Sequence, residues 1–189
     1  MSMDIKKFNL GDLIFILFYK NGGKISGSTT LQKLIDIIRL DSGIPIDIDY
    51  LPYDYGDFSQ EVKDVVQVFE DNSWIKTEEI GFQDNKTIKN YWLTETGMKI
   101  AQTIYENLLS RELDYFNVID RFKDKTQEQI VKYSYFWYPK TAIKSKIKDD
   151  LFKKSRLLEI FSGELEEEYN NLKASGKTIK EVIRETWRC

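Results

Sequence analysis

The chain has 189 residues, of which 41% are apolar and 31% charged, and its formal net charge is −3. This composition fits one medium-sized domain, or a small domain with a helical extension, and excludes a disordered tail. There is no histidine and one cysteine, Cys189, which excludes Ser-His-Asp and Cys-His hydrolases, Cys/His zinc sites and an internal disulfide. The sequence therefore predicts neither an enzyme nor a bound cofactor or metal.

Two features bear on location. Residues 1–7 lack the pattern of a signal peptide, and the apolar run over 13–19 is too short to span a bilayer. A lone cysteine fits a reducing compartment. We expect a cytoplasmic protein that does not enter a membrane.

Charge is sorted along the chain. Residues 1–107 carry 11 basic and 17 acidic side chains, which gives −6, whereas residues 108–189 carry 17 and 14, which gives +3. Within 121–156 the count is 11 basic against 4 acidic side chains, or +7. An uneven distribution of charge along the chain indicates which partners a protein attracts, and it does not indicate the fold.

The first elements are helical, with short strands between them. The apolar run over 10–20 predicts a buried helix capped by Asn9, with a strand as the alternative. A short strand at 24–26 and a helix over 28–40 follow. Over 46–50 apolar residues alternate with aspartates, which predicts a half-buried strand.

A third helix, a hairpin and a fourth helix come next. Ser59 is a favourable cap for a helix over 60–71. Residues 74–94 read as a β-hairpin whose register the sequence does not specify, because its apolar residues do not alternate cleanly. Thr94 then opens a long helix over 95–113.

The remaining residues are predicted to be helical. Thr126 and Gln129 form the sequence pattern of a capping box, and Pro139 stops the helix that this box opens. Residues 140–161 can form one or two basic amphipathic helices, and shorter helices follow to Trp187.

Three short strings carry a family resemblance. The string Leu93-Thr94-Glu95-Thr96-Gly97, after the hairpin, resembles the Leu-Thr-x-x-Gly string of prokaryotic winged-helix proteins. Leu31-Gln32-Lys33-Leu34-Ile35 and Tyr55-Gly56-Asp57-Phe58-Ser59 are similar to strings of the YwgA-type and Panacea-type small prokaryotic proteins, with Asp57 where those families usually have Pro. The resemblance covers residues 8–107. It implies a winged-helix-like domain used in regulation or toxin neutralisation.

The expected fold class is therefore α+β. We expect a winged helix-turn-helix-like domain at 1–107 and a helical C-terminal region at 108–189 that serves dimerisation or partner binding. Enzyme motifs fit poorly: Gly22-Gly23-Lys24 lacks the first glycine and the Ser or Thr of a phosphate loop. Asp54, Glu61 and Lys63 match the acidic residues and lysine of a restriction-type nuclease, but the predicted helix separates Glu61 from Lys63.

The predicted third helix is acidic. In a DNA-binding winged helix this element enters the major groove. Here its polar residues include four acids and one lysine, which phosphate would repel, so the helix is expected to face solvent or a partner protein. Gln60 and Gln67 can read adenine edges only if other groups first supply the attraction to DNA.

The strongest nucleic-acid signal is the basic segment 121–156, whose lysines are interleaved with the aromatic run 133–138. Such lysines can neutralise phosphate while exposed rings stack on bases. Alternatively, the rings belong to a core or dimer interface and the lysines to a solvated face. The candidate DNA-binding residues are Lys76, Lys86 and Lys89 on the hairpin, with Lys140, Lys144, Lys146, Lys148, Lys153 and Lys154.

Two functions remain open from the sequence. The first is a transcription-regulator-like protein that binds double-stranded DNA as a homodimer, through the hairpin and the basic segment. The second is a protein-interaction module, antitoxin-like or an adaptor, that does not bind DNA and meets its partner at the acidic helix 60–71. Lysines of the basic segment that share a face with Lys86 and Lys89 would favour the first. Lysines that are scattered, or neutralised by Glu164, Glu166, Glu167 and Glu168, would favour the second.

Overall fold

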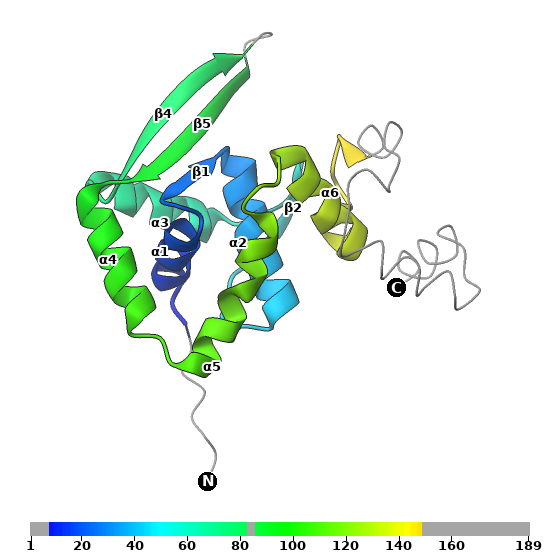
Figure 1. Ribbon diagram of the computed structural model, residues 1–189. Helices are drawn as coiled ribbons and strands as arrows, with labels where there is room; N and C mark the ends of the chain where they lie inside the picture. The colour runs from blue at the N-terminus through cyan, green and yellow to red at the C-terminus, as the bar shows by residue number, and fades with distance from the viewer. Residues whose placement is uncertain (1–7, 83–85, 149–189) are drawn as a thin grey trace. The chain divides into compact units, whose positions relative to one another are not determined.

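The computed structural model describes residues 8–82 and 86–148. These residues form a mixed α+β structure with small antiparallel sheets (Figure 1). The predicted α+β fold class is thus confirmed. The chain divides into two compact units. The first comprises Met1–Leu51 with Phe58–Ile130, and the second Pro52–Asp57 with Val131–Cys189.

Two buried helices form the centre of the first unit. In α1 (Leu10–Lys20) six consecutive residues, from Leu13 to Phe18, are at most 4% exposed. In α2 (Ser28–Ser42) nine consecutive residues are buried. A helix that is covered on every side needs apolar residues all round, which is why the sequence of α1 lacks a clear polar face. The predicted helix over 10–20 is confirmed, with the Asn9 side chain accepting a hydrogen bond from the Asp12 amide at 2.7 Å.

A three-stranded antiparallel sheet adjoins these helices. Its strands β1 (Lys24–Ser26), β4 (Ile75–Phe82) and β5 (Lys86–Leu93) lie in the order β1-β5-β4. The predicted hairpin and short strand are confirmed. The pairing of Ile75 with Leu93 and of Ile25 with Tyr91 places these four apolar side chains on the buried face. The β4–β5 hairpin extends away from the helices (Figure 1).

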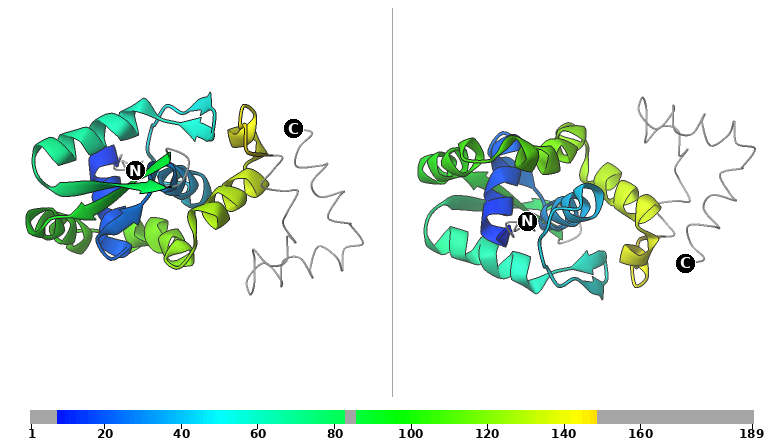
Figure 2. Two further views of the ribbon diagram at one scale, coloured as in Figure 1. Left: turned by 90° about the horizontal axis from the view of Figure 1, so that it is seen from above. Right: turned by 90° about the horizontal axis from the view of Figure 1, so that it is seen from below.

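Helix α1 lies between α3 (Gln60–Asp71) and α4 (Glu95–Glu106), as Figure 2 shows. The Thr94 hydroxyl caps α4 by accepting a hydrogen bond from the Gly97 amide at 3.1 Å. Both helix starts agree with the prediction.

The expectation of one helix over 95–113 is wrong. Helix α4 ends at Glu106, and the Asn107 side chain donates a hydrogen bond to the Thr103 carbonyl at 2.8 Å, which satisfies a terminal acceptor. The chain continues through α5 (Ser110–Leu113) and the 3₁₀ helix η2 (Asp114–Phe122), which packs against α2. The apolar side chains of η2 are therefore used within the first unit.

The predicted strand over 46–50 is also wrong. The alternation correctly identified Ile48 as buried and Asp47 and Asp49 as exposed, but the segment joins no strand ladder. A two-stranded sheet forms just after it, from β2 (Leu51–Tyr53) and β3 (Gly56–Phe58). Alternation reports which side chains face the core, whereas a strand also needs a backbone partner.

Helix α6 (Gln127–Trp137) begins at the end of the first unit and continues into the second. The predicted capping box is confirmed, because Thr126 and Gln129 exchange side-chain-to-amide hydrogen bonds. Pro139 opens a 3₁₀ helix, η3 (Pro139–Ala142), which is followed by a non-helical segment to Ile147. The expected helices over 140–161 are therefore absent over 143–147, and residues 149–161 lie outside the described part of the chain.

Candidate interaction surfaces

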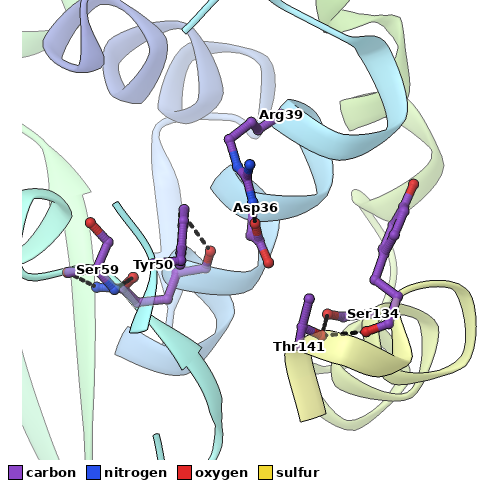
Figure 3. Close-up of polar contacts among 8 residues, drawn as sticks. Asp36, Arg39, Tyr50, Ser59, Ser134 and Thr141 are labelled. Carbon is purple, nitrogen blue, oxygen red and sulfur yellow. Dashed lines mark hydrogen bonds and ion pairs between the residues drawn. The ribbon is translucent and has the colours of Figure 1, made fainter. Parts of the chain in front are cut away.

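Helix α3 is held firmly against the core. The Gln32 side chain donates to the Ser59 carbonyl at 2.9 Å and accepts from the Ser59 amide at 3.1 Å (Figure 3). The Ser59 hydroxyl in turn caps α3 by accepting from the Val62 amide. On the inner face of α3, Phe69 stacks on Phe15 with ring centroids 4.1 Å apart. These contacts fix which face of α3 points outward.

That outward face is acidic. Glu61, Asp64 and Asp71 are exposed, and Val68 is 49% exposed among them. They follow one another at helical spacing, so they form one stripe. We call Glu61, Asp64, Val68 and Asp71 the α3 stripe.

The two glutamines of α3 are engaged by acids of the same helix. Gln60 donates its amide N–H to Asp64 at 2.7 Å, and Gln67 donates to Asp71 at 2.9 Å. A bidentate adenine contact needs both the amide donor and the carbonyl acceptor of a glutamine. Reading a base would therefore first break one of these hydrogen bonds.

The hairpin lysines point in different directions. Lys89 lies on the face of β5 that packs against the helices, where it pairs with Glu70 at 2.7 Å and sits 5.6 Å from the Tyr91 ring. Lys76 lies on the outward face. The side chain of Lys86 is outside the described part of the structure, although its backbone belongs to β5.

Lys76 belongs to a row of side chains that the sequence did not reveal. Lys24, Trp92 and Lys76 are direct neighbours across β1, β5 and β4. The ammonium groups of Lys24 and Lys76 lie 5.3 and 6.0 Å from the centre of the Trp92 ring, within the range of cation–π attraction. Neither Lys24 nor Trp92 was a candidate, because the pairing of β1 with the distant β5 is not visible in the sequence.

The start of the basic segment is partly neutralised within the first unit. Lys123 and Lys20 pair with Asp120 at 2.7 and 2.8 Å, and Arg121 lies 3.7 Å from Asp41. Partial burial raises the pKa of Asp120, but hydrogen bonds from Lys123 and Lys20 outweigh it and hold that pKa below its ordinary value. These cations are thus less available to phosphate.

The remaining candidate lysines belong to the second unit. Lys140 and Lys144 are exposed, Lys148 is half-buried, and Lys146 pairs with Asp54 at 2.6 Å. Lys132 is buried. Lys153 and Lys154 lie outside the described residues.

One ring of the aromatic run, Tyr135, belongs to a small core. Tyr135 is completely buried among Val131 and Ala142, and its hydroxyl donates to the Ser145 hydroxyl at 2.9 Å. Burial raises the pKa of Tyr135, in part offset by that hydrogen bond. Ser134 and Thr141, drawn in Figure 3, share a hydrogen bond of 3.3 Å beside this small core. Tyr135 therefore follows the alternative interpretation of the run.

Helix α2 carries buried charges that sequence reasoning did not single out. Lys33 is 1% and Asp36 0% exposed. Asp36 accepts a hydrogen bond from Arg39 at 2.7 Å, and the Arg39 guanidinium lies 5.1 Å from the Tyr50 ring (Figure 3). A helical pattern that is apolar at neighbouring positions gives no sign that a lysine and an aspartate would also be covered.

No protein-family model matches the chain, and no curated protein is significantly similar to it. Within 8–82 and 86–148, no helix has the length and apolar character needed to cross a bilayer.

Proposed function

We propose that this chain is a protein-interaction module on a winged-helix-like scaffold, and that the α3 stripe binds a basic segment of a partner protein. The order of helices, strand and hairpin over 10–106 supports the scaffold. Antitoxin-like and adaptor proteins are the classes that this function includes.

The observation that carries the proposal is the composition of the α3 stripe. Three carboxylates surround one exposed apolar side chain, Val68, on a helix whose other face is anchored in the core. An apolar centre with a charged rim is the usual anatomy of a protein interface. Charge complementarity then favours a basic partner.

The same contacts disfavour double-stranded DNA as the ligand of α3. Carboxylates repel phosphate, and phosphate contacts supply most of the non-specific affinity for DNA. The glutamine amides that could read bases already donate to Asp64 and Asp71.

The test compares the full-length chain with two double variants as baits in extract of the source cells. E61K/D64K reverses two charges of the α3 stripe, and E95K/E106K makes the same change on α4 as the matched control. We expect a protein that is captured by the wild type and the control and lost from E61K/D64K. Equal capture by all three baits, or no specific capture by the wild type, contradicts the proposal.

A second candidate is a DNA-binding regulator, favoured by the row of Lys24, Trp92 and Lys76 on the outward face of the sheet. Lysines on a hairpin can contact phosphates beside the groove. As a regulator it would act as a homodimer, which light scattering measures. K24E/K76E should then abolish binding to a random DNA duplex, whereas E61K/D64K should not weaken it.

A further inference from the structure

Two tyrosines at the β2–β3 turn are exposed although their neighbours have structural roles. Tyr53 is 59% and Tyr55 52% exposed. Gly56 adopts φ = 89°, which favours glycine, and Ser59 caps α3. Because Tyr55 is more than half exposed, packing in the core does not account for a tyrosine at this position.

Asp54, which lies between these tyrosines, fixes the turn to the lysine-rich segment after η3. The Lys146 amide donates to the Asp54 carbonyl at 2.9 Å, and the Lys146 ammonium donates to the Asp54 carboxylate at 2.6 Å. The hydrogen bond from Lys146 and the charge of Asp54 raise the pKa of Lys146, and Tyr55 and Tyr53 add to this effect. A cation is thus held next to two exposed phenol rings.

The described residues of the second unit carry a net positive charge. The described residues of the second unit contain five lysines and two aspartates, 5 − 2 = +3. Lys140 and Lys144 are exposed and have no acidic partner among the residues that the structure describes. Ile143, between them, is 69% exposed. A polyanion is therefore the complementary ligand.

We propose that Tyr53, Tyr55, Lys140 and Lys144 form a binding site for single-stranded nucleic acid. The tyrosine rings stack on unpaired bases, and the two lysines contact phosphates. We call these four residues the tyrosine–lysine site.

The composition favours nucleic acid over an acidic protein segment. Lysine is depleted at the centre of protein interfaces, whereas lysines beside exposed rings are typical of single-strand binding sites. The rings also favour single strands over duplexes, because the bases of a duplex are already stacked on one another. Each ring can add affinity only where a base is free.

The experiment measures fluorescence anisotropy of a labelled oligothymidylate of about 20 nucleotides, longer than the usual single-strand site, with the full-length chain. A duplex of the same length is the comparison. We expect the single strand to bind more tightly. Tyr55→Ala should weaken its binding roughly 5- to 150-fold, the effect of losing one stacked base, and Tyr55→Phe should retain it.

A lysine variant tests the phosphate contacts. Lys144→Gln should lower the slope of log affinity against log salt by about 0.7, the value for one phosphate contact of a single strand. Lys63→Gln, the same change on an exposed face of α3, should leave the slope unchanged.

Three results would overturn the proposal. The first is no binding of the oligothymidylate by the wild type. The second is equal binding of single strand and duplex with no effect of Tyr55→Ala. The third is displacement of the oligothymidylate by polyglutamate at the same charge concentration, again without an effect of Tyr55→Ala. This result would assign the surface to an acidic protein segment. The proposed protein interaction is tested with E61K/D64K, which changes no residue of the tyrosine–lysine site. A failure to bind the oligothymidylate can therefore be distinguished from a failure of the protein interaction.

Discussion

Replacement of Gln32 by Met tests how α3 is held. The Gln32 side chain is 7% exposed and bonds both the amide and the carbonyl of Ser59, which is itself completely buried. Methionine has a similar length and flexibility, so it fills the space but makes neither hydrogen bond. The Ser59 amide is then left without a partner in the interior.

The expected loss of stability follows from the Ser59 amide and carbonyl, which both lose the Gln32 side chain as hydrogen-bond partner. A buried donor or acceptor without a partner costs about 1–3 kcal/mol. The Ser59 carbonyl keeps a long contact of 3.5 Å with the Lys63 amide, so its loss is the smaller one. We therefore expect Gln32→Met to lower the free energy of unfolding by about 2–4 kcal/mol.

Urea denaturation followed by circular dichroism measures this change. Gln67→Met is the matched control: Gln67 is exposed and makes one side-chain hydrogen bond to Asp71, so we expect a loss of less than about 0.5 kcal/mol. Ser59→Ala should cost about 1 kcal/mol through the lost cap. Equal losses from Gln32→Met and Gln67→Met would refute the reasoning.

Two further predictions concern a glycine and a tyrosine of the first unit. A Cβ on Gly97 would clash with the Trp74 carbonyl oxygen, so Gly97→Ala should lower the free energy of unfolding by about 1–3 kcal/mol despite the better helix propensity of alanine. Gly81→Ala should change it little, because no atom of the described residues lies within 4 Å of a Cβ there. Similar losses from both substitutions in urea denaturation would contradict this. Burial, and next the charge of Glu70, raises the pKa of Tyr91 from 10.0 to about 12. The unfolded chain therefore loses this proton first, and stability should fall as pH rises from about 10 to about 12, by up to about 1.4 kcal/mol per pH unit. Tyr91→Phe should remove the loss of stability that the ionisation of Tyr91 causes. Identical profiles of stability against pH for the wild type and Tyr91→Phe would contradict this cause.

The local signals in the sequence predicted the elements well. The caps at Asn9, Ser59, Thr94 and Thr126 all form as expected, because each depends on residues within one turn. The errors arise where the outcome depends on distant partners. Residues 46–50 have the alternation of a strand but no neighbouring strand, and the helix opened by Thr94 stops at Glu106.

The resembling strings gain a physical explanation within this chain. Gln32, in the string 31–35, bonds the backbone of Ser59, in the string 55–59, so these two strings depend on each other although Gln32 and Ser59 are 27 positions apart. In the string 93–97, Thr94 caps α4 and Gly97 allows the close approach of the Trp74 carbonyl. Neither the contact between Gln32 and Ser59 nor the approach of the Trp74 carbonyl to Gly97 could be derived from spacing along the chain.

Charge counts along the sequence were the weakest guide to a binding site. The net charge of +7 over 121–156 does not show which cations have acidic partners, because these partners can lie far away in the chain. Arg121 lies near Asp41, and Lys146 pairs with Asp54. The cations that remain for a ligand are fewer than the count suggests.

This difference gives a final prediction about salt dependence. Two double variants remove the same charge from the basic segment. K140Q/K144Q acts on lysines that have no acidic partner within 8–82 and 86–148, and R121Q/K123Q acts on residues near Asp41 and Asp120. Each phosphate contact contributes about 0.7 to the salt slope for a single strand. K140Q/K144Q should therefore lower the slope of oligothymidylate binding by about 1.4, whereas R121Q/K123Q should leave it nearly unchanged, because cations held by carboxylates release few counterions from the nucleic acid. Equal decreases in both variants would mean that the ion pairs open when the nucleic acid binds. The net charge of 121–156 would then describe the binding surface better than the ion pairs do.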